Sequence, residues 1–295
     1  MIGRALLLAA AVAAPAHAQD APPRLAAPAD CSTNPNCAPG LKRSYNVDAG
    51  PHLVKLADAD SGIQALDDGL AEVAVAFTSN PALSRPDVVT LRDDKHMIGA
   101  DRVVPIARSA LLDRYGVALR RRLNETSRLL STLALRSLNQ QVIDGRLPEA
   151  VGGEFVDANG LASGARHRSG PRIVIGYQDF AENQTLAYLY AQALRSGGYR
   201  VRVRSVHGLR PEAISLLRRD KIDMYPAYSG SVLRYLVGTT PQALKAGLRR
   251  TLERIGCVPF KQAAAQDSNA FITKTDTAAR LGLHTISDLA QYWPA

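Results

Sequence analysis

No segment of this 295-residue sequence is apolar over the roughly 18 residues that a membrane-spanning helix requires, so no such helix is predicted. Catalytic signatures are equally scarce. There is no serine-nucleophile elbow, no phosphate-binding Walker loop, no dinucleotide fingerprint and no paired-histidine zinc motif. The six histidines are scattered and do not have the spacing of metal ligands. We therefore expect a protein that is not an enzyme and that has no cofactor and no metal ion.

The first 18 residues have the pattern of an export signal. Arg4 supplies a short positive region, residues 5–14 (ALLLAAAVAA) are apolar, and Ala16, His17 and Ala18 form an A-x-A cleavage site. A buried N-terminal helix is less favoured, because Pro15 and the Pro/Ala-rich stretch 21–29 follow at once. No cysteine follows the apolar region as a lipid anchor would require. We expect a free periplasmic protein, cleaved near Ala18.

Three cysteines fit an oxidising compartment. Cys31 and Cys37 flank a short segment in which Asn34 and Pro35 signal a turn, and a local disulfide between them is the leading interpretation. A zinc site is the weaker one, because no further His/Cys pair lies nearby at ligand spacing. Cys257 is left over and is expected to be a buried thiol.

The formal net charge of +9 raises the question of nucleic acid or an anionic surface as a partner. The arginines, however, are distributed over several expected helices, and no nucleic-acid-binding motif accompanies them. A solvated basic surface is the better interpretation, and we expect no nucleic-acid partner.

From residue 172 onward, short apolar strands alternate with amphipathic helices. Strands are expected at 172–176, 199–206 and 222–225, with helices at 183–196 and 211–219 between them. Strands joined by crossover helices run parallel, so this order predicts a parallel, doubly wound α/β sheet. Further on, a helix is expected from Thr240 to Gly256, a strand at 270–273 and a last helix at 285–291.

The first half is also α/β. Strands are expected at 72–77 and 88–91, and helices at 109–115, 120–142 (one helix or two) and 148–159. Residues 162–172 (ASGARHRSGPR) have no apolar period and are expected to form a linker.

Aromatic and polar side chains gather where the expected strands begin or end. They are Tyr177, Asp179 and Phe180, then Tyr225, Tyr228, Ser229 and Ser231, and finally Asn269 and Phe271. In open α/β sheets, ligands bind outside the carboxyl ends of the strands. A tyrosine face attracts a quaternary ammonium by about 0.5–2 kcal/mol per ring. These side chains suit a ligand site and equally suit packing at loop junctions, and the residues alone do not decide between the two.

Two long segments resemble the glycine betaine/choline/osmoprotectant-binding family of ABC importers. The first includes IVIGYQDF at 173–180, IDMYPAYSG at 222–230, SNAF at 268–271 and TISDLA at 285–290. The second includes GLK at 40–42, ALDDGLAEVAV at 65–75, LRDDK at 91–95, Val104 with Pro105, and residues 148–161. Together they cover nearly all of the expected mature chain.

The order of the two segments is reversed relative to the family, so the chain resembles a circular permutant. The linker at 162–172 would join the family's usual ends, and the new termini would interrupt the family's path from the region of Ala290 to that of Cys31. Permutation is tolerated where chain ends lie close together at the surface. A fusion of two truncated proteins is less favoured, because the two segments are complementary and do not overlap.

The resemblance implies a two-lobed, type II periplasmic-binding-protein-like α/β fold. Lobe one is expected to span 97–273, and lobe two to pair 24–95 with 276–295. The permutation also requires the C-terminal residues 287–292 to pack with residues 40–91.

The resemblance further implies a monomeric solute-binding component that closes around a small quaternary amine or zwitterionic osmoprotectant and then docks on a membrane permease with its ATPase. The alternatives are a ligand-binding sensor module or an enzyme on the same architecture. A sensor is expected to carry a membrane anchor or an output domain, and an enzyme a nucleophile–base pair or metal ligands.

By resemblance, the ligand contacts the strand-end residues given above, together with Thr78 from the other lobe. The family commonly has a tyrosine a few residues after the Asp-Asp-Lys motif, and by spacing Asp101 takes its place here. A carboxylate there removes one ring of an aromatic cage and instead accepts hydrogen bonds from N–H donors or pairs with a cation. An Asp101 that faces solvent or pairs with the neighbours of Arg102 is the equal alternative.

Residues 1–18 are predicted to be absent from the exported protein. Mass spectrometry of periplasmic material should find an N-terminus near Gln19. Exported protein that retains Met1 would contradict the export signal.

Overall fold

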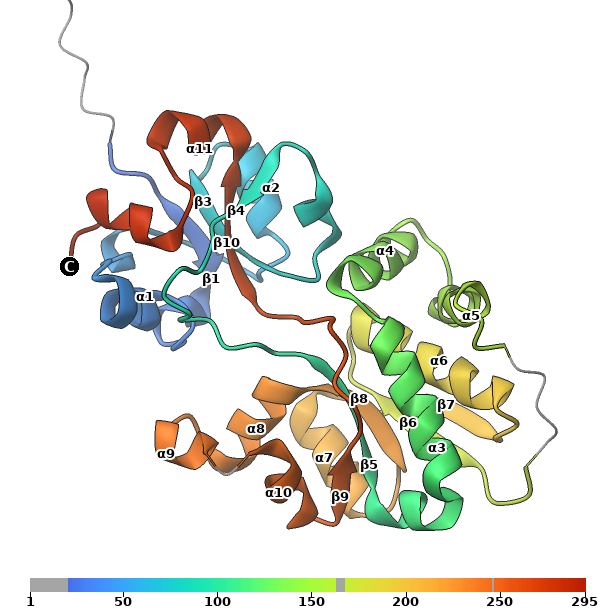
Figure 1. Cartoon of the computed structure of the whole chain (residues 1–295). Coiled ribbons are helices and arrows are strands. Elements are labelled where there is room, and N and C mark those ends of the chain that lie inside the picture. Colours follow the sequence, from blue (N-terminus) through green and yellow to red (C-terminus); the bar gives the residue numbers. More distant parts are fainter. Residues whose placement is uncertain (1–20, 163–167, 246) are drawn as a thin grey trace, which may run out of the picture.

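The computed structural model describes residues 21–162, 168–245 and 247–295. The predicted signal peptide lies outside the described residues, as do positions 163–167 of the expected linker. The described chain folds into two lobes, each built on a five-stranded sheet (Figure 1). The predicted two-lobed α/β fold is therefore confirmed.

Lobe two contains the sheet β2-β1-β3-β10-β4. Its strands are β1 (Leu25–Pro28), β2 (Leu53–Leu56), β3 (Val73–Phe77), β4 (Val88–Thr90) and β10 (Asn269–Lys274). Strand β1 is parallel to β2 and β3, whereas β10 is antiparallel to β3 and β4. Its helices are η1 (Ala29–Ser32), α1 (Ala38–Tyr45), η2 (Gly50–His52), α2 (Gly62–Asp67), η3 (Pro81–Ser84), α11 (Thr275–Leu281) and η4 (Ile286–Gln291).

Lobe one contains the sheet β7-β6-β8-β5-β9. Its strands are β5 (Val103–Arg108), β6 (Ile173–Tyr177), β7 (Val201–Ser205), β8 (Met224–Tyr228) and β9 (Cys257–Pro259). Its helices are α3 (Ser109–Leu129), α4 (Thr132–Ile143), α5 (Pro148–Ala158), α6 (Ala181–Ser196), α7 (Arg210–Arg218), α8 (Ser229–Val237), α9 (Pro241–Leu244) and α10 (Leu248–Glu253).

The predicted parallel arrangement holds for β6, β7 and β8 but not for the whole sheet. Strands β5 and β9 were not predicted, and β5 is antiparallel to both β8 and β9. The helix expected from Thr240 to Gly256 is instead two short helices, α9 and α10, and Gly247 before α10 has a φ of +74°. Such a backbone angle does not continue an α-helix.

The boundary between the lobes also differs from the expected one. Strand β10 was assigned to lobe one by the range 97–273, but it pairs with β3 over five residues in the sheet of lobe two. The chain therefore leaves lobe one before Asn269.

The two ends of the described chain lie in the same lobe. Leu289 and Trp293 belong to the hydrophobic core that contains Leu41 and Tyr45, and Trp293 Nε1 donates a hydrogen bond of 2.7 Å to the carbonyl of Pro23. The C-terminal segment thus packs against the N-terminal region, as predicted.

Two segments of the chain connect the lobes, at 91–102 and 260–268, and they run side by side between the lobes in Figure 1. Backbone hydrogen bonds join them: the Asp267 N–H donates to the Asp101 carbonyl (3.0 Å), and the Val103 N–H donates to the Ala265 carbonyl (2.9 Å). The Asp101 N–H donates to Ser268 Oγ at 3.0 Å. The two connections therefore form one paired hinge region.

Within the described ranges, no helix is both long and apolar enough to cross a bilayer. In the same part of the chain, no group of three or more His, Cys, Asp or Glu side chains is placed to hold a metal ion.

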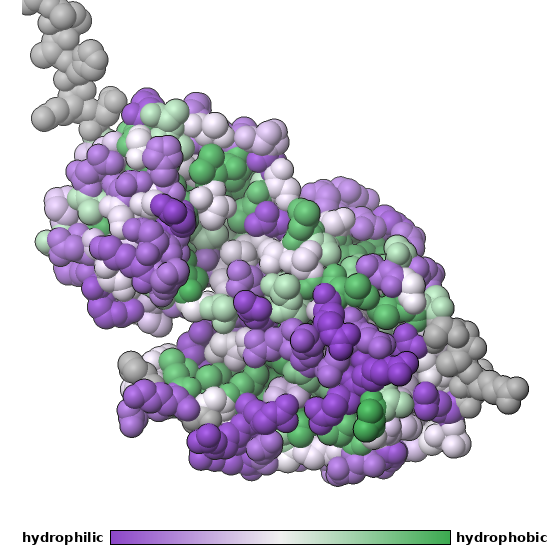
Figure 2. All heavy atoms as spheres, viewed as in Figure 1, coloured by the Kyte–Doolittle hydropathy of each residue, from purple (hydrophilic) through white to green (hydrophobic). Residues whose placement is uncertain are grey.

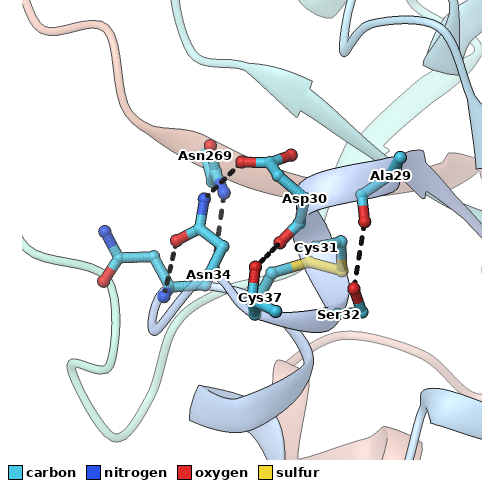
Figure 3. Close-up of a disulfide and its surroundings, with 9 residues drawn as sticks. Ala29, Asp30, Cys31, Ser32, Asn34, Cys37 and Asn269 are labelled. Carbon is cyan, nitrogen blue, oxygen red and sulfur yellow. Dashed lines mark hydrogen bonds between the residues drawn. A yellow bond between two sulfur atoms is a disulfide. The ribbon is translucent and has the colours of Figure 1, made fainter.

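Cys31 and Cys37 form a disulfide in lobe two, as predicted (Figure 3). The loop that it closes packs tightly on α1, where a Cβ on Gly40 would lie 2.2 Å from the Pro35 carbonyl oxygen. The same loop is tied to β10 by a hydrogen bond of 3.4 Å from Asn269 Nδ2 to the Asn36 carbonyl. Cys257 is buried and unpaired, and burial raises the pKa of its thiol to about 11, which keeps it protonated and unreactive.

Replacing Cys31 and Cys37 together by alanine should lower the free energy of unfolding by about 2–3 kcal/mol, the loop-closure entropy of so short a loop. Urea titration of the mature protein measures this loss, with Cys257→Ala as the matched control. Alkylation of the folded protein without reductant should leave Cys31 and Cys37 unlabelled, and labelling of both would contradict the disulfide.

Candidate ligand-binding cleft

A cleft of about 1070 Å³ lies between the lobes. Lobe two contributes the disulfide loop and the end of β3, lobe one contributes α4 and the first turns of α6 and α8, and the paired hinge contributes its own side chains. Figure 2 shows the lobes as two masses with a hollow between them at the left of the view. The volume suits a small molecule.

Five of the predicted site residues line this cleft: Phe180, Tyr228, Ser231, Asn269 and Asp101. They come from the residue before α6, from β8, α8 and β10, and from the hinge, and they belong to four separate segments of the sequence. The fold therefore brings strand-end residues of both lobes to one place.

The other six predicted residues are not among those that line the cleft. Tyr225 and Phe271 are completely buried in the cores of lobe one and lobe two, respectively. Tyr225 is three residues before Tyr228 in β8, so its side chain points to the opposite face of the sheet from that of Tyr228. Phe271 shares the face of Asn269 but lies further along β10, inside the core of lobe two. Tyr177 packs against the core of lobe one.

Asp179, Thr78 and Ser229 make local hydrogen bonds instead. Asp179 accepts one from Ser205 at the end of β7. Thr78 Oγ1 donates to the Gln266 carbonyl at 2.9 Å, and Ser229 Oγ accepts from the Arg102 N–H at 3.1 Å. Thr78 and Ser229 thus each fasten one lobe to the hinge.

Asp101 faces the cleft but its carboxylate is already occupied. It accepts hydrogen bonds from the Ser231 N–H (2.9 Å) and the Ser231 hydroxyl, and an ion pair of 3.2 Å joins it to Arg234. The partner of Asp101 is thus Arg234 on α8, which the sequence analysis did not name. Its charge is balanced before any ligand arrives.

Three further carboxylates line the cleft that the sequence did not single out: Asp60 of lobe two, Glu182 and Asp267. Glu182, in the first turn of α6, accepts hydrogen bonds from the Tyr228 hydroxyl and from Asn139 Nδ2 on α4 (2.6 Å). Asp267, in the hinge, accepts one from Ser79 Oγ at 2.8 Å. Glu182 and Asp267 lie close to predicted positions in the sequence. Glu182 is two residues after Phe180, and Asp267 is two residues before Asn269.

The surroundings of these carboxylates disfavour their charged forms. Burial raises the pKa of Glu182, although the hydroxyls of Tyr228 and Ser79 and the amide of Asn139 partly offset this. Burial, and then the charge of Glu182, raises the pKa of Asp267 well above its usual value. Burial and the same charge also raise the pKa of Tyr228. Burial, more than any neighbouring charge, therefore disfavours ionisation of these groups.

Two aromatic rings stand beside the carboxylates. The centroids of Phe180 and Tyr228 lie 6.3 Å apart with their planes at 25°, a stacked pair. Phe180 is 37% exposed and Tyr228 only 5%, so the Phe180 ring offers the larger accessible surface. The cleft therefore combines an apolar wall with negative charge, an arrangement that suits an organic cation.

The two α/β lobes, the paired hinge and the cleft define a two-lobed binding protein. The chain belongs to the family described as the substrate binding domain of ABC-type glycine betaine transport systems, whose model matches residues 10–158 and 171–294. This confirms the family inferred from the sequence motifs.

Solved structures are similar in fold at low identity. A phosphate-binding protein of a phosphate ABC transporter from Streptococcus pneumoniae is 10% identical, with a TM-score of 0.46, over 92% of this chain and 95% of that one. An ancestral arginine-binding protein bound to arginine is 10% identical, with a TM-score of 0.38, over 92% and 98%. The GLUR0 ligand-binding core in complex with L-glutamate is 9% identical, with a TM-score of 0.39, over 87% and 86%. No curated protein sequence matches.

Asp267→Asn should stabilise the ligand-free protein at pH 8. The raised pKa means that the folded state holds the carboxyl proton more tightly than the unfolded state, so the aspartate costs stability as pH rises through its folded pKa. The asparagine keeps an acceptor for Ser79 and carries no charge. Each kcal/mol regained should raise Tm by about 2–4 °C.

Thermal melts at pH 8 and pH 4 test this prediction. The gain should be present at pH 8 and shrink toward zero at pH 4, close to the ordinary pKa of an aspartate in the unfolded state. Asp113→Asn, at an exposed position of α3, is the control and should leave Tm unchanged at both values. A destabilised Asp267→Asn variant at pH 8 would refute the unfavourable placement of this charge.

Proposed function

We propose that the mature protein is the periplasmic solute-binding component of an ABC importer and that it binds a small quaternary amine or zwitterionic osmoprotectant of the glycine betaine or choline type between its lobes. The observation that carries this proposal is the grouping of Glu182 and Asp267 beside the Phe180–Tyr228 ring pair in the interlobe cleft. Family membership supports the transport role.

A cation in this position is favoured on two physical grounds. The carboxylates are held where burial penalises their charge, and a positive ligand offsets that penalty. A ring face adds about 0.5–2 kcal/mol for an ammonium group within about 6 Å of its centroid.

A zwitterionic ligand also carries a carboxylate, and the cleft wall has a cation available for it. Arg210, at the start of α7, lines the cleft, whereas Arg234 is engaged with Asp101. A betaine bound with its ammonium toward Asp267 would extend its carboxylate toward Arg210.

The remaining parts of the proposal follow from the transport role. The protein acts as a monomer outside the cytoplasmic membrane, performs no chemistry on its solute, and delivers it to a membrane permease driven by an ATPase. Ligand binding closes the two lobes about the paired hinge.

We also propose that the chain is a circular permutant of its family. The family model matches in two pieces, and the gap at 159–170 between them overlaps the expected linker at 162–172. The hydrogen bond from Trp293 to Pro23 holds the two ends of the described chain together in lobe two, as termini created within one lobe require.

Calorimetric titration with choline, glycine betaine, carnitine and proline betaine tests the proposed ligand class. At least one should bind, and at 100 times its Kd it should stabilise the fold by about 2.7 kcal/mol. Glu182→Gln should weaken binding by about 10- to 100-fold, the loss expected for a charge-assisted contact.

Glu253→Gln on α10, an exposed glutamate outside the cleft, is the matched control and should bind as the wild type does. Absence of binding by every amine tested, or equal affinity of the Glu182→Gln variant, would contradict the proposed site.

A further inference from the structure

Helix α4 of lobe one contacts the segment of lobe two that follows β3. Arg136 on α4 donates hydrogen bonds from Nε to the Thr78 carbonyl (2.8 Å) and from Nη1 to the Leu83 carbonyl (3.4 Å). Burial lowers the pKa of Arg136, and no charged neighbour among the described residues raises it. Main-chain oxygens of the other lobe are therefore what this half-buried guanidinium is paired with.

Asn139, one turn further along α4, bonds to both lobes. Its Nδ2 donates to the Ser79 carbonyl of lobe two (3.1 Å) and to the carboxylate of Glu182 in lobe one (2.6 Å). Residues three apart lie on the same face of a helix, so Arg136 and Asn139 present their donors to lobe two together. The hydrogen bonds of these two side chains to the segment 78–83 are termed the α4 contact.

The α4 contact is continuous with the paired hinge. In lobe two, Ser79 Oγ donates to Asp267 Oδ1 of the hinge at 2.8 Å. In lobe one, Thr132 at the start of α4 accepts a hydrogen bond of 3.3 Å at its Oγ1 from the Gln266 N–H of the hinge. Both partners in the α4 contact are thus also bonded to the segment that connects the lobes.

The other end of the cleft has no such contact. There the cleft is lined by Asn34 and Asn36 of the disulfide loop and by Arg234, Tyr235 and Thr239 in and after α8. Among the described residues, hydrogen bonds join the loop to β10 and α8 to the hinge, but no hydrogen bond or ion pair joins the loop to α8. Helices α4 and α8 lie on opposite sides of the connecting segments in Figure 1, and the hollow in Figure 2 is on the α8 side.

From this asymmetry, we infer that Arg136 and Asn139 are positioning residues that hold the lobes together on the α4 side, so that the cleft opens only between the disulfide loop and α8. The lobes turn about an axis through the hinge and the α4 contact, and the solute enters and leaves beside the disulfide loop. The inference rests on the proposed function and assigns residues to its closing motion.

Asn139 also connects the α4 contact to the solute. Glu182, which accepts one of its hydrogen bonds, is a carboxylate beside which the ammonium group is proposed to lie. A cation there favours the ionised form of Glu182, and an ionised acceptor makes the stronger hydrogen bond. Solute binding therefore strengthens the bond between Glu182 and Asn139, and by reciprocity the α4 contact strengthens solute binding.

Small-angle X-ray scattering of the ligand-free mature protein tests the α4 contact without any solute. In the double variant Arg136→Ala/Asn139→Ala, the lobes are free to separate on this side too, and the radius of gyration should increase. Alanine is the best helix former, so α4 itself is preserved. Gln140→Ala, at an exposed position of the same helix, is the matched control and should scatter as the wild type does.

A thermal melt establishes that each variant is folded. A folded double variant with the radius of gyration of the wild type would overturn the inference. If the double variant does not fold, Asn139→Ala alone makes the same comparison with Arg136 in place.

Calorimetric titration with choline and glycine betaine tests the connection to Glu182. Asn139→Ala should weaken binding by about 10-fold, the factor expected for one hydrogen bond to a charged group. Added to Glu182→Gln, it should weaken binding no further, because its charged acceptor is already gone. A loss that simply adds to that of Glu182→Gln would indicate a general structural effect and would overturn the role of Asn139.

The two measurements separate this inference from the proposed function. If neither amine binds to the wild type, the proposed function is contradicted, and the scattering comparison still decides the α4 contact. If an amine binds and the α4 variants scatter and bind as the wild type does, the inference is overturned and the proposed function stands.

Discussion

The pairing of the two connections between the lobes is the constraint on which the site depends. Within the part of the chain that the structure describes, the segments 91–102 and 260–268 connect the two sheets, and backbone hydrogen bonds hold them side by side. Because Asp101 and Asp267 lie on these paired segments, the hinge that positions the lobes also carries part of the cleft wall. Thr78 and Ser229 then tie one lobe each to this region, so the lobes and the ligand site share one support.

The carboxylates of the cleft are placed at a cost to the ligand-free fold. Glu182 and Asp267 stand where burial and repulsion disfavour their ionised forms, while Asp101 is fully compensated by Ser231 and Arg234. A protein selected for stability alone would neutralise all three in the same way. Binding sites commonly give up stability that a ligand restores, and under the proposed function the solute would restore it at these carboxylates.

The sequence predicted the lobes more completely than the site. Periodicity located β6, β7 and β8 with their helices, but β5 was missed because Pro105 within it weakens the strand pattern. Motifs at strand ends found Tyr228 and Asn269, because strand ends converge in this fold. Glu182 was missed because an acidic residue in the first turn of a helix has an ordinary explanation in the helix dipole. Asp267 was missed because the hinge has no period, and its role depends on a partner far away in the sequence.

The central claim is that an ammonium group binds at the carboxylates of the hinge and α6. The most direct test is a crystal structure of the mature protein with the tightest-binding of choline, glycine betaine, carnitine and proline betaine. The account predicts the ammonium group of the ligand beside the carboxylates of Asp267 and Glu182 and within about 6 Å of the ring centroid of Phe180 or Tyr228. A ligand outside the interlobe cleft, or one whose ammonium group contacts neither carboxylate, would contradict it.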